Sequence, residues 1–220
     1  MWITVNGVEL YYQKTGQGSP VVLLHGNGES HRIFDVLIRQ LATRHTVYAL
    51  DSRGQGRSQM GDGISYNQMA RDTAAFIRAL GLEKPAVYGF SDGGIIGLLL
   101  AIHWPGLLSR LAVSGANAMP QGMRARWYWL FRVMDQFAGE APMLRMMVQE
   151  PQITAEQLRS IRLPVLVLAG QRDMVRTQHT CWIAQNIPGS KLCFVPKAGH
   201  GDYIVHSPRV YHYIKDFLRP

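Results

Sequence analysis

The sequence is poor in cysteine, with only Cys181 and Cys193 among its 220 residues. A disulfide framework requires a higher density of cysteines, so this class of small, cross-linked domain is excluded. No apolar run approaches the roughly 18 residues that a transmembrane helix requires. The strand-like residues 2–5 also lack the basic and apolar regions of a signal peptide. We therefore expect a soluble, cytoplasmic protein without a membrane span.

Blocks of like charge are absent as well. The net charge is +8, but the lysines and arginines are scattered, without a basic run laced with aromatic residues. Such runs are typical of nucleic-acid-binding segments. The charge therefore indicates a basic solvated surface and no nucleic-acid partner, and leaves open a weak preference for anionic substrates. The length fits a single domain, residues 1–220, because most domains hold about 50 to 250 residues.

Alternating strand and helix patterns are abundant. Short strand-like runs, several of them continuously apolar, occupy residues 2–5, 7–12, 21–24, 47–50, 86–90, 111–114, 163–169 and 192–195. Helical patterns occupy residues 33–41, 66–80, 93–103, 178–186 and 208–218. Continuously apolar strands are typical of parallel sheets buried on both faces. The alternation predicts an α/β fold with a mostly parallel central sheet flanked by helices.

Residues 116–161 interrupt this alternation with helical sequence. An apolar stripe at spacing i, i+3, i+4, i+7 consists of Trp127, Leu130, Phe131 and Met134. A second apolar patch consists of Met143, Met146 and Met147. Inserted between two strands, the segment predicts a small helical cap over the strand ends, at about residues 116–161. The alternative is a set of additional core helices.

The motif G-x-S-x-G occurs at Gly89-Phe-Ser-Asp-Gly93, between a predicted strand and an apolar helix. The sharp strand-to-helix turn of this motif crowds its neighbours, and glycine relieves the crowding because it has no β-carbon. Ser91 is then expected at the carboxyl edge of the sheet, where α/β folds place their sites. This context predicts a nucleophilic serine. The alternative is a serine that only caps a helix.

A nucleophilic serine needs a histidine base and an acid that orients it, in the chain order serine, acid, histidine. Asp173 follows the predicted strand 163–169, and His200 follows the strand 192–195. Both lie in loops at the same sheet edge as Ser91, so we predict Ser91, Asp173 and His200 as a catalytic triad. The alternatives are a turn aspartate and a surface histidine. Asp202 and His206 are nearby competitors that lie farther into the loop.

Acyl transfer also needs donors for the oxyanion, usually two backbone N–H groups. Asp92, after the nucleophile, supplies one, and Asn27 in His25-Gly-Asn-Gly28 is expected to supply the other. We expect His25 to brace this loop. Such a site requires no metal and no organic cofactor. In the cap, Trp127, Phe131 and Met134 are predicted to bind an apolar part of the substrate; the alternative is that they only pack the cap onto the body.

Five motifs occur in the order expected of one superfamily: H-G-N-G at 25–28, D-S-R-G-Q-G-R-S at 51–58, the serine motif at 89–93, G-Q-R-D at 170–173 and A-G-H at 198–200. The chain resembles the α/β-hydrolases of the esterase and lipase superfamily over nearly its whole length. The sequences at 89–94 and 115–118 further resemble the valacyclovir hydrolase (biphenyl hydrolase-like) group. That group hydrolyses α-amino-acid esters, and the resemblance implies that Asp92 holds the substrate's ammonium. The alternative is an aspartate favoured by the dipole of the helix that it begins.

The sequence therefore predicts a serine hydrolase that cleaves a carboxylic ester or related acyl bond of a small molecule through an acyl-enzyme. Serine at position 91 argues against the dehalogenase branch, whose nucleophile is an aspartate. Other chemistries at the same triad remain open, namely hydrolysis of C–C bonds or lactones and perhydrolysis. A non-enzymatic ligand-binding protein is a further alternative. The natural substrate and the oligomeric state are not determined by the sequence.

Overall fold

The computed structural model describes residues 1–139 and 141–219. Its strands are β1 (Trp2–Val5), β2 (Val8–Thr15), β3 (Ser19–Leu24), β4 (His45–Leu50), β5 (Ala86–Phe90), β6 (Arg110–Ser114), β7 (Val165–Gly170) and β8 (Lys191–Val195). The α-helices are α1 (Asp35–Leu41), α2 (Tyr66–Ala79), α3 (Asp92–His103), α4 (Ala125–Phe137), α5 (Pro142–Gln149), α6 (Ala155–Arg159), α7 (Thr177–Asn186) and α8 (Tyr211–Ile214).

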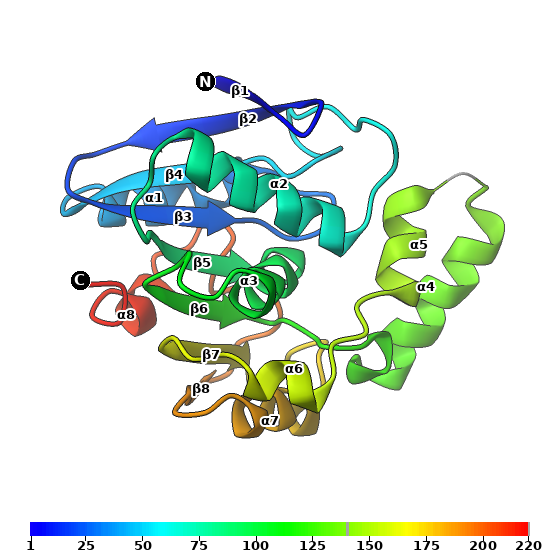
Figure 1. Cartoon of the computed structure of the whole chain (residues 1–220). Coiled ribbons are helices and arrows are strands. Elements are labelled where there is room, and N and C mark those ends of the chain that lie inside the picture. Colours follow the sequence, from blue (N-terminus) through cyan, green and yellow to red (C-terminus); the bar gives the residue numbers. More distant parts are fainter. Residues whose placement is uncertain (140, 220) are drawn as a thin grey trace.

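The eight strands form one sheet in the order β1-β2-β4-β3-β5-β6-β7-β8 (Figure 1). The pairs β1–β2 and β2–β4 are antiparallel, and every later pair is parallel. The continuously apolar run 21–24 is fully buried at the centre of the sheet, as expected for a strand covered on both faces. The predicted fold class, a mostly parallel sheet flanked by helices, is confirmed.

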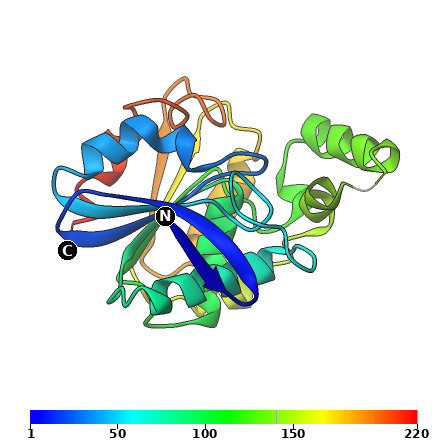
Figure 2. The same cartoon turned by 90° about the horizontal axis from the view of Figure 1, so that it is seen from above.

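Helices cover both faces of the sheet. One core lies between the sheet and helices α2, α3, α6 and α7. The other lies under α1 and the C-terminal segment that contains α8. Figure 2 shows α1 and α2 on opposite sides of the strands. With both faces covered, the loops at the carboxyl ends of the parallel strands remain as the place for a site.

Two predicted helices differ from the observed ones in extent. The pattern at 33–41 begins as a 3₁₀ turn, His31–Phe34, capped by the Ser30 hydroxyl, and continues as α1. The pattern at 208–218 forms regular helix only at α8. Its apolar residues at four-residue spacing, Val210, Ile214 and Leu218, are nevertheless buried. The periodicity therefore reports which side chains face the core even where the backbone forms turns.

The segment between β6 and β7 has two parts. Helices α4 and α5 pack on each other beyond the carboxyl ends of the parallel strands (Figure 1). Helix α6 instead contacts α3 and α7, and Ile153, Leu158 and Ile161 belong to the core. The last part of the predicted insertion thus packs within the body. Among the helices of the described residues, none has the length and apolarity to cross a membrane.

Candidate active site

Ser91 occupies a sharp turn between β5 and α3, with φ 52° and ψ −115°. Positive φ is a strained conformation for a residue with a β-carbon, and such strain is held only where the surroundings fix it. A β-carbon on Gly89 would collide with the carbonyl of Gly93, and one on Gly93 would collide with the carbonyl of Leu24. The two glycines of the motif therefore allow the tight turn that exposes the serine side chain at the sheet edge.

The structure brings the three residues predicted as a triad together. Nε2 of His200 lies 3.1 Å from Oγ of Ser91, and Nδ1 of His200 lies 2.7 Å from Oδ1 of Asp173. Asp173 is almost fully buried. Because a carboxylate only accepts hydrogen bonds, its contact requires a proton on Nδ1 of His200. A neutral imidazole then presents an unprotonated Nε2 to the serine hydroxyl.

Backbone N–H groups hold Asp173 in place. Its Oδ2 accepts from the amide of Gly170 at 3.1 Å, and its Oδ1 accepts from the amide of Val175 at 3.0 Å. The two competing residues lie elsewhere. Asp202 accepts from the amide of Gly199 within the histidine loop, and His206 pairs with Asp35 at the surface. Neither competitor forms a hydrogen bond with Ser91, whose hydroxyl pairs with His200.

The predicted oxyanion donors flank the serine. Within the part of the chain that the structure describes, the amides of Asn27 and Asp92 have no hydrogen-bond partner. The buried His25 braces the loop as expected: its Nδ1 contacts the carbonyl of Gly26 at 2.7 Å, and its Nε2 accepts from the amide of Ser52 at 3.0 Å. Burial lowers the pKa of His25, so the neutral form is favoured and the loop keeps its shape.

The carboxylate of Asp92 contacts this loop through Asn27 and is only 3% exposed. Its Oδ1 accepts from the Tyr66 hydroxyl at 2.7 Å, and its Oδ2 accepts from Nδ2 of Asn27 at 2.9 Å. Burial raises the pKa of Asp92 to about 6, although the two hydrogen bonds act in the opposite direction. Each oxygen thus accepts one hydrogen bond and keeps capacity for another, but the cavity that Asp92 lines measures only about 20 Å³, so a substrate ammonium would need movement of the lining residues to reach this carboxylate.

Two cavities of very different size meet at Ser91 and His200. The larger, of about 270 Å³, is lined by Gly26, Asn27, Glu29, Phe90, Ser91, Phe131, Met147, Met174, His200 and Gly201. The smaller, of about 20 Å³, is lined by Tyr66, Ser91, Asp92, Gly115, Asn117, Met123, Met147, Met174, Val175 and His200. The smaller has room for about one water molecule. A molecule held at Ser91 therefore has space on one side of the serine only.

The three cap residues predicted to bind substrate differ in position. Phe131 lines the larger cavity. Trp127 stacks on Phe131, with ring centroids 6.1 Å apart, and is not among the lining residues. Met134 is 47% exposed and lies outside both cavities. Of the three, only Phe131 therefore lies against the cavity at Ser91, and its contact with substrate stays a prediction.

The site also contains residues that the sequence analysis did not assign to it. Met147 and Met174 line both cavities. Met147 belongs to the second apolar patch of the cap, and Met174 directly follows Asp173. Glu29 accepts from the amide of Gly26 at 3.0 Å and lines the larger cavity together with Ser91. Partial burial raises the pKa of Glu29. The signal in the sequence that indicates a place for Glu29 near Ser91 is its position immediately after His25-Gly-Asn-Gly28.

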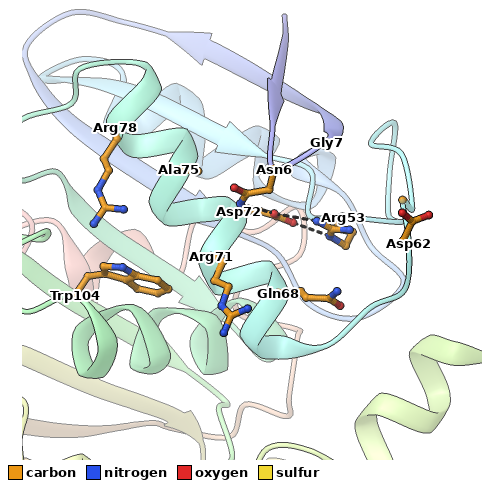
Figure 3. A pocket seen from close by; sticks show the side chains of 11 residues that line it. Asn6, Gly7, Arg53, Asp62, Gln68, Arg71, Asp72, Ala75, Arg78 and Trp104 are labelled. Atoms are coloured by element: carbon orange, nitrogen blue, oxygen red, sulfur yellow. Dashed lines mark hydrogen bonds and ion pairs between the residues drawn. The ribbon is translucent and has the colours of Figure 1, made fainter.

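A separate and larger cleft of about 570 Å³ lies between the β1–β2 turn, the loop after β4, α2 and the end of α3, and contains no triad residue (Figure 3). Its main feature is a buried ion pair in which Nε and Nη2 of Arg53 contact the two carboxylate oxygens of Asp72 at 2.7 and 3.0 Å. Asn6 also donates to Asp72. This pair fixes the loop after β4 onto α2.

Known proteins resemble the chain over nearly its whole length. The family model described as alpha/beta hydrolase fold matches residues 19–150. The human protein Serine hydrolase BPHL is 28% identical over 250 residues, which cover 99% of this chain and 85% of the human protein. The 2-hydroxy-6-oxo-2,4-heptadienoate hydrolase of Pseudomonas putida is 25% identical over 261 residues, covering 98% and 95%.

Solved structures show the same fold. A thermophilic esterase from Thermogutta terrifontis superposes with a TM-score of 0.81 at 24% identity, covering 99% of this chain and 96% of the esterase. The match to Serine hydrolase BPHL confirms the resemblance to the biphenyl hydrolase-like group. The chain therefore belongs to the α/β hydrolase fold family and is an enzyme of the hydrolase class.

Proposed function

We propose that this protein hydrolyses carboxylic esters or related acyl bonds of small molecules through a covalent acyl-enzyme on Ser91. The observation that carries the proposal is the continuous chain of contacts from Asp173 through His200 to Ser91, at 2.7 and 3.1 Å. A serine hydroxyl is a weak nucleophile by itself, and a hydrogen-bonded imidazole whose other nitrogen is oriented by a carboxylate activates it.

In the first half-reaction, Oγ of Ser91 attacks the carbonyl carbon while Nε2 of His200 takes the hydroxyl proton. Asp173 stabilises the imidazolium that forms. The N–H groups of Asn27 and Asp92 donate to the developing oxyanion. When the tetrahedral intermediate collapses, the bond to the alcohol breaks and the alcohol leaves with the proton from Nε2, which leaves the acyl group on Ser91.

In the second half-reaction, Nε2 of His200 takes a proton from water, and the resulting hydroxide equivalent attacks the acyl carbon. Collapse of the second intermediate returns the proton to Oγ of Ser91 and releases the carboxylic acid. Only side chains, backbone amides and water take part in these steps.

The unequal cavities support an asymmetric substrate. About 270 Å³ is available on the side of Phe131 and Glu29, and about 20 Å³ on the side of Asp92 and Asn117. An ester with one small group and one larger, partly apolar group matches this space. An ester with two bulky groups does not fit without movement of Met147 or Met174, which line both cavities.

The test is a paired assay of the wild type and Ser91→Ala with a fluorophosphonate probe and with p-nitrophenyl esters. We expect the wild type to be labelled covalently and to turn over the esters, and Ser91→Ala to fold normally and lose both properties. Ester turnover retained by Ser91→Ala would exclude Ser91 as the nucleophile. Labelling without turnover of any ester would replace ester hydrolysis with another chemistry at the same triad or with ligand binding.

A further inference from the structure

Helix α4 presents an apolar face to solvent. Five of its side chains are between 45% and 84% exposed, namely Trp129, Leu130, Val133, Met134 and Phe137. Their spacing of i, i+1, i+4, i+5 and i+8 places them on one side of the helix, and no residue of α4 is buried. We call these five residues the outer face of α4. A contiguous exposed apolar patch of this kind marks an interaction surface.

Positive charge accompanies this face. Arg126 and Arg132 lie on α4 itself, and Arg124 precedes it. The only acidic residue within residues 116–139 is Asp135, and its Oδ1 already lies 3.5 Å from Nε of Arg145 on α5. An amphipathic helix that combines tryptophan, phenylalanine and arginine has the composition of helices that lie in the boundary between lipid headgroups and acyl chains.

The side of α4 next to the outer face turns toward the active site. Phe131 lines the larger cavity together with Ser91 and His200, and Trp127 stacks against Phe131. Figure 2 shows the pair of α4 and α5 at the rim of the molecule, to one side of the sheet. The outer face is therefore accessible to an extended surface such as a membrane. Helix α4 would then lie between that surface and Ser91.

We propose that the outer face of α4 binds an anionic lipid surface and thereby places the Ser91 cleft beside amphiphilic esters held in that surface. The arginines would contact lipid phosphates while the apolar side chains enter the headgroup layer. The binding itself does not depend on the proposed ester hydrolysis, whereas the delivery of substrate rests on it.

Charge decides between this partner and a second copy of the chain. A twofold-symmetric dimer presses the same patch of both copies together, so the positive charges of Arg126 and Arg132 would be brought into one contact from both copies. Asp135, the acidic residue of α4 itself, is already paired with Arg145. Like charges at a desolvated contact are unfavourable, whereas anionic phosphates complement them.

The experiment measures sedimentation of the protein with vesicles of phosphatidylcholine alone and with vesicles of equal parts phosphatidylcholine and phosphatidylglycerol. A first variant carries Trp129→Gln, Val133→Gln and Phe137→Gln, which replace exposed side chains only. Ser91→Ala is included because it separates binding from catalysis. Turnover of a soluble acetate ester shows that each variant apart from Ser91→Ala keeps an intact site.

A second variant, Arg126→Gln with Arg132→Gln, removes two positive charges at the outer face. Its matched control, Arg44→Gln with Arg159→Gln, removes two exposed charges elsewhere on the body. We expect the wild type, Ser91→Ala and the control to bind the anionic vesicles similarly and the phosphatidylcholine vesicles weakly. The variant with three glutamines should bind the anionic vesicles at least tenfold more weakly. In the variant without Arg126 and Arg132, the affinity for these vesicles should fall about fivefold for each arginine.

Absence of vesicle binding by the wild type, or equal binding by the variant with three glutamines, would overturn the proposal. A dimer observed by sedimentation equilibrium in the wild type but not in the variant with three glutamines would also overturn the proposal, because a second copy would then cover the outer face. Vesicle binding by a wild type that hydrolyses no ester would contradict the proposed function and the delivery of substrate, and would leave the binding surface intact.

Discussion

The Tyr66 hydroxyl donates a 2.7 Å hydrogen bond to Oδ1 of Asp92, the residue that follows Ser91 in the chain. Tyr66 begins α2 and Asp92 begins α3, so the bond joins the first residues of two helices that pack together. Because Asp92 also accepts from the side chain of Asn27, one buried carboxylate connects α2, α3 and the loop that contains Asn27. Its ionisation is therefore coupled to both stability and the shape of the site.

The first prediction concerns the pH dependence of stability. The pKa of Asp92 rises from 3.8 to about 6 in the folded protein, so the folded state holds this proton more tightly than the unfolded chain. The free energy of unfolding should fall as the pH rises from about 4 through about 6, by about 3 kcal/mol in total. In Asp92→Asn this contribution is absent. Urea unfolding of both proteins at several pH values measures the difference, and parallel curves would contradict the shifted pKa.

The second prediction concerns Asp173, which fixes the orientation of His200 and the proton on its Nδ1. Asp173→Asn keeps the shape of the side chain but presents an amide that favours the wrong tautomer of His200. We expect kcat for a p-nitrophenyl ester to fall by about 10³- to 10⁴-fold with an unchanged far-UV circular dichroism spectrum. Asp202→Asn is the control, since Asp202 contacts the loop at Gly199 and not the imidazole. A larger loss in Asp202→Asn than in Asp173→Asn would reassign the acid.

The sequence predicted the site best where a motif determines the local backbone conformation and where the order of the strands determines at which edge of the sheet a loop lies. Strand, glycine, serine and glycine predict the turn at Ser91, and parallel strands of known order bring the loops of Asp173 and His200 to the same edge. Competing residues such as Asp202 could be ranked only by their place in the loop. Their actual partners follow from the loop's hydrogen bonds, which no pattern in the sequence encodes.

The contacts around the site were less predictable from the sequence than the identity of the three residues Ser91, Asp173 and His200. Tyr66 and Asp92 are 26 residues apart, and only the packing of α2 on α3 brings them together. In the cap, the apolar stripe identified side chains on one broad side of α4. It could not tell that Phe131 turns toward the cavity while Met134 turns toward solvent, because all the residues of that stripe are apolar.

The third prediction concerns the ion pair of Arg53 and Asp72, whose side chains are 6% and 3% exposed (Figure 3). Arg53→Met leaves a buried carboxylate without its cation and should destabilise the fold by about 3 to 5 kcal/mol. Arg39→Met is the control, because Arg39 forms an exposed pair with Asp35 at 3.7 Å, of the kind that contributes at most about 1 kcal/mol. Equal urea midpoints for the two variants would show that the buried pair does not hold the loop after β4.

The fourth prediction distinguishes the two sides of α4 by substrate preference. Phe131 lines the larger cavity beside Ser91, whereas Met134 is 47% exposed. Phe131→Ala removes apolar contact with the larger group of the substrate. It should lower kcat/KM by about tenfold for an ester with a long chain and by less than about twofold for an acetate ester with a small alcohol.

Met134→Ala should leave both values unchanged, because its side chain lies outside both cavities. The comparison requires soluble esters below their aggregation limit, so that contact between α4 and an aggregate does not enter the measurement. If Met134→Ala alters the chain-length preference and Phe131→Ala does not, α4 must rotate about its axis when substrate binds. The large cavity would then be formed by residues that now face solvent, and the asymmetry between the two cavities would no longer predict the substrate.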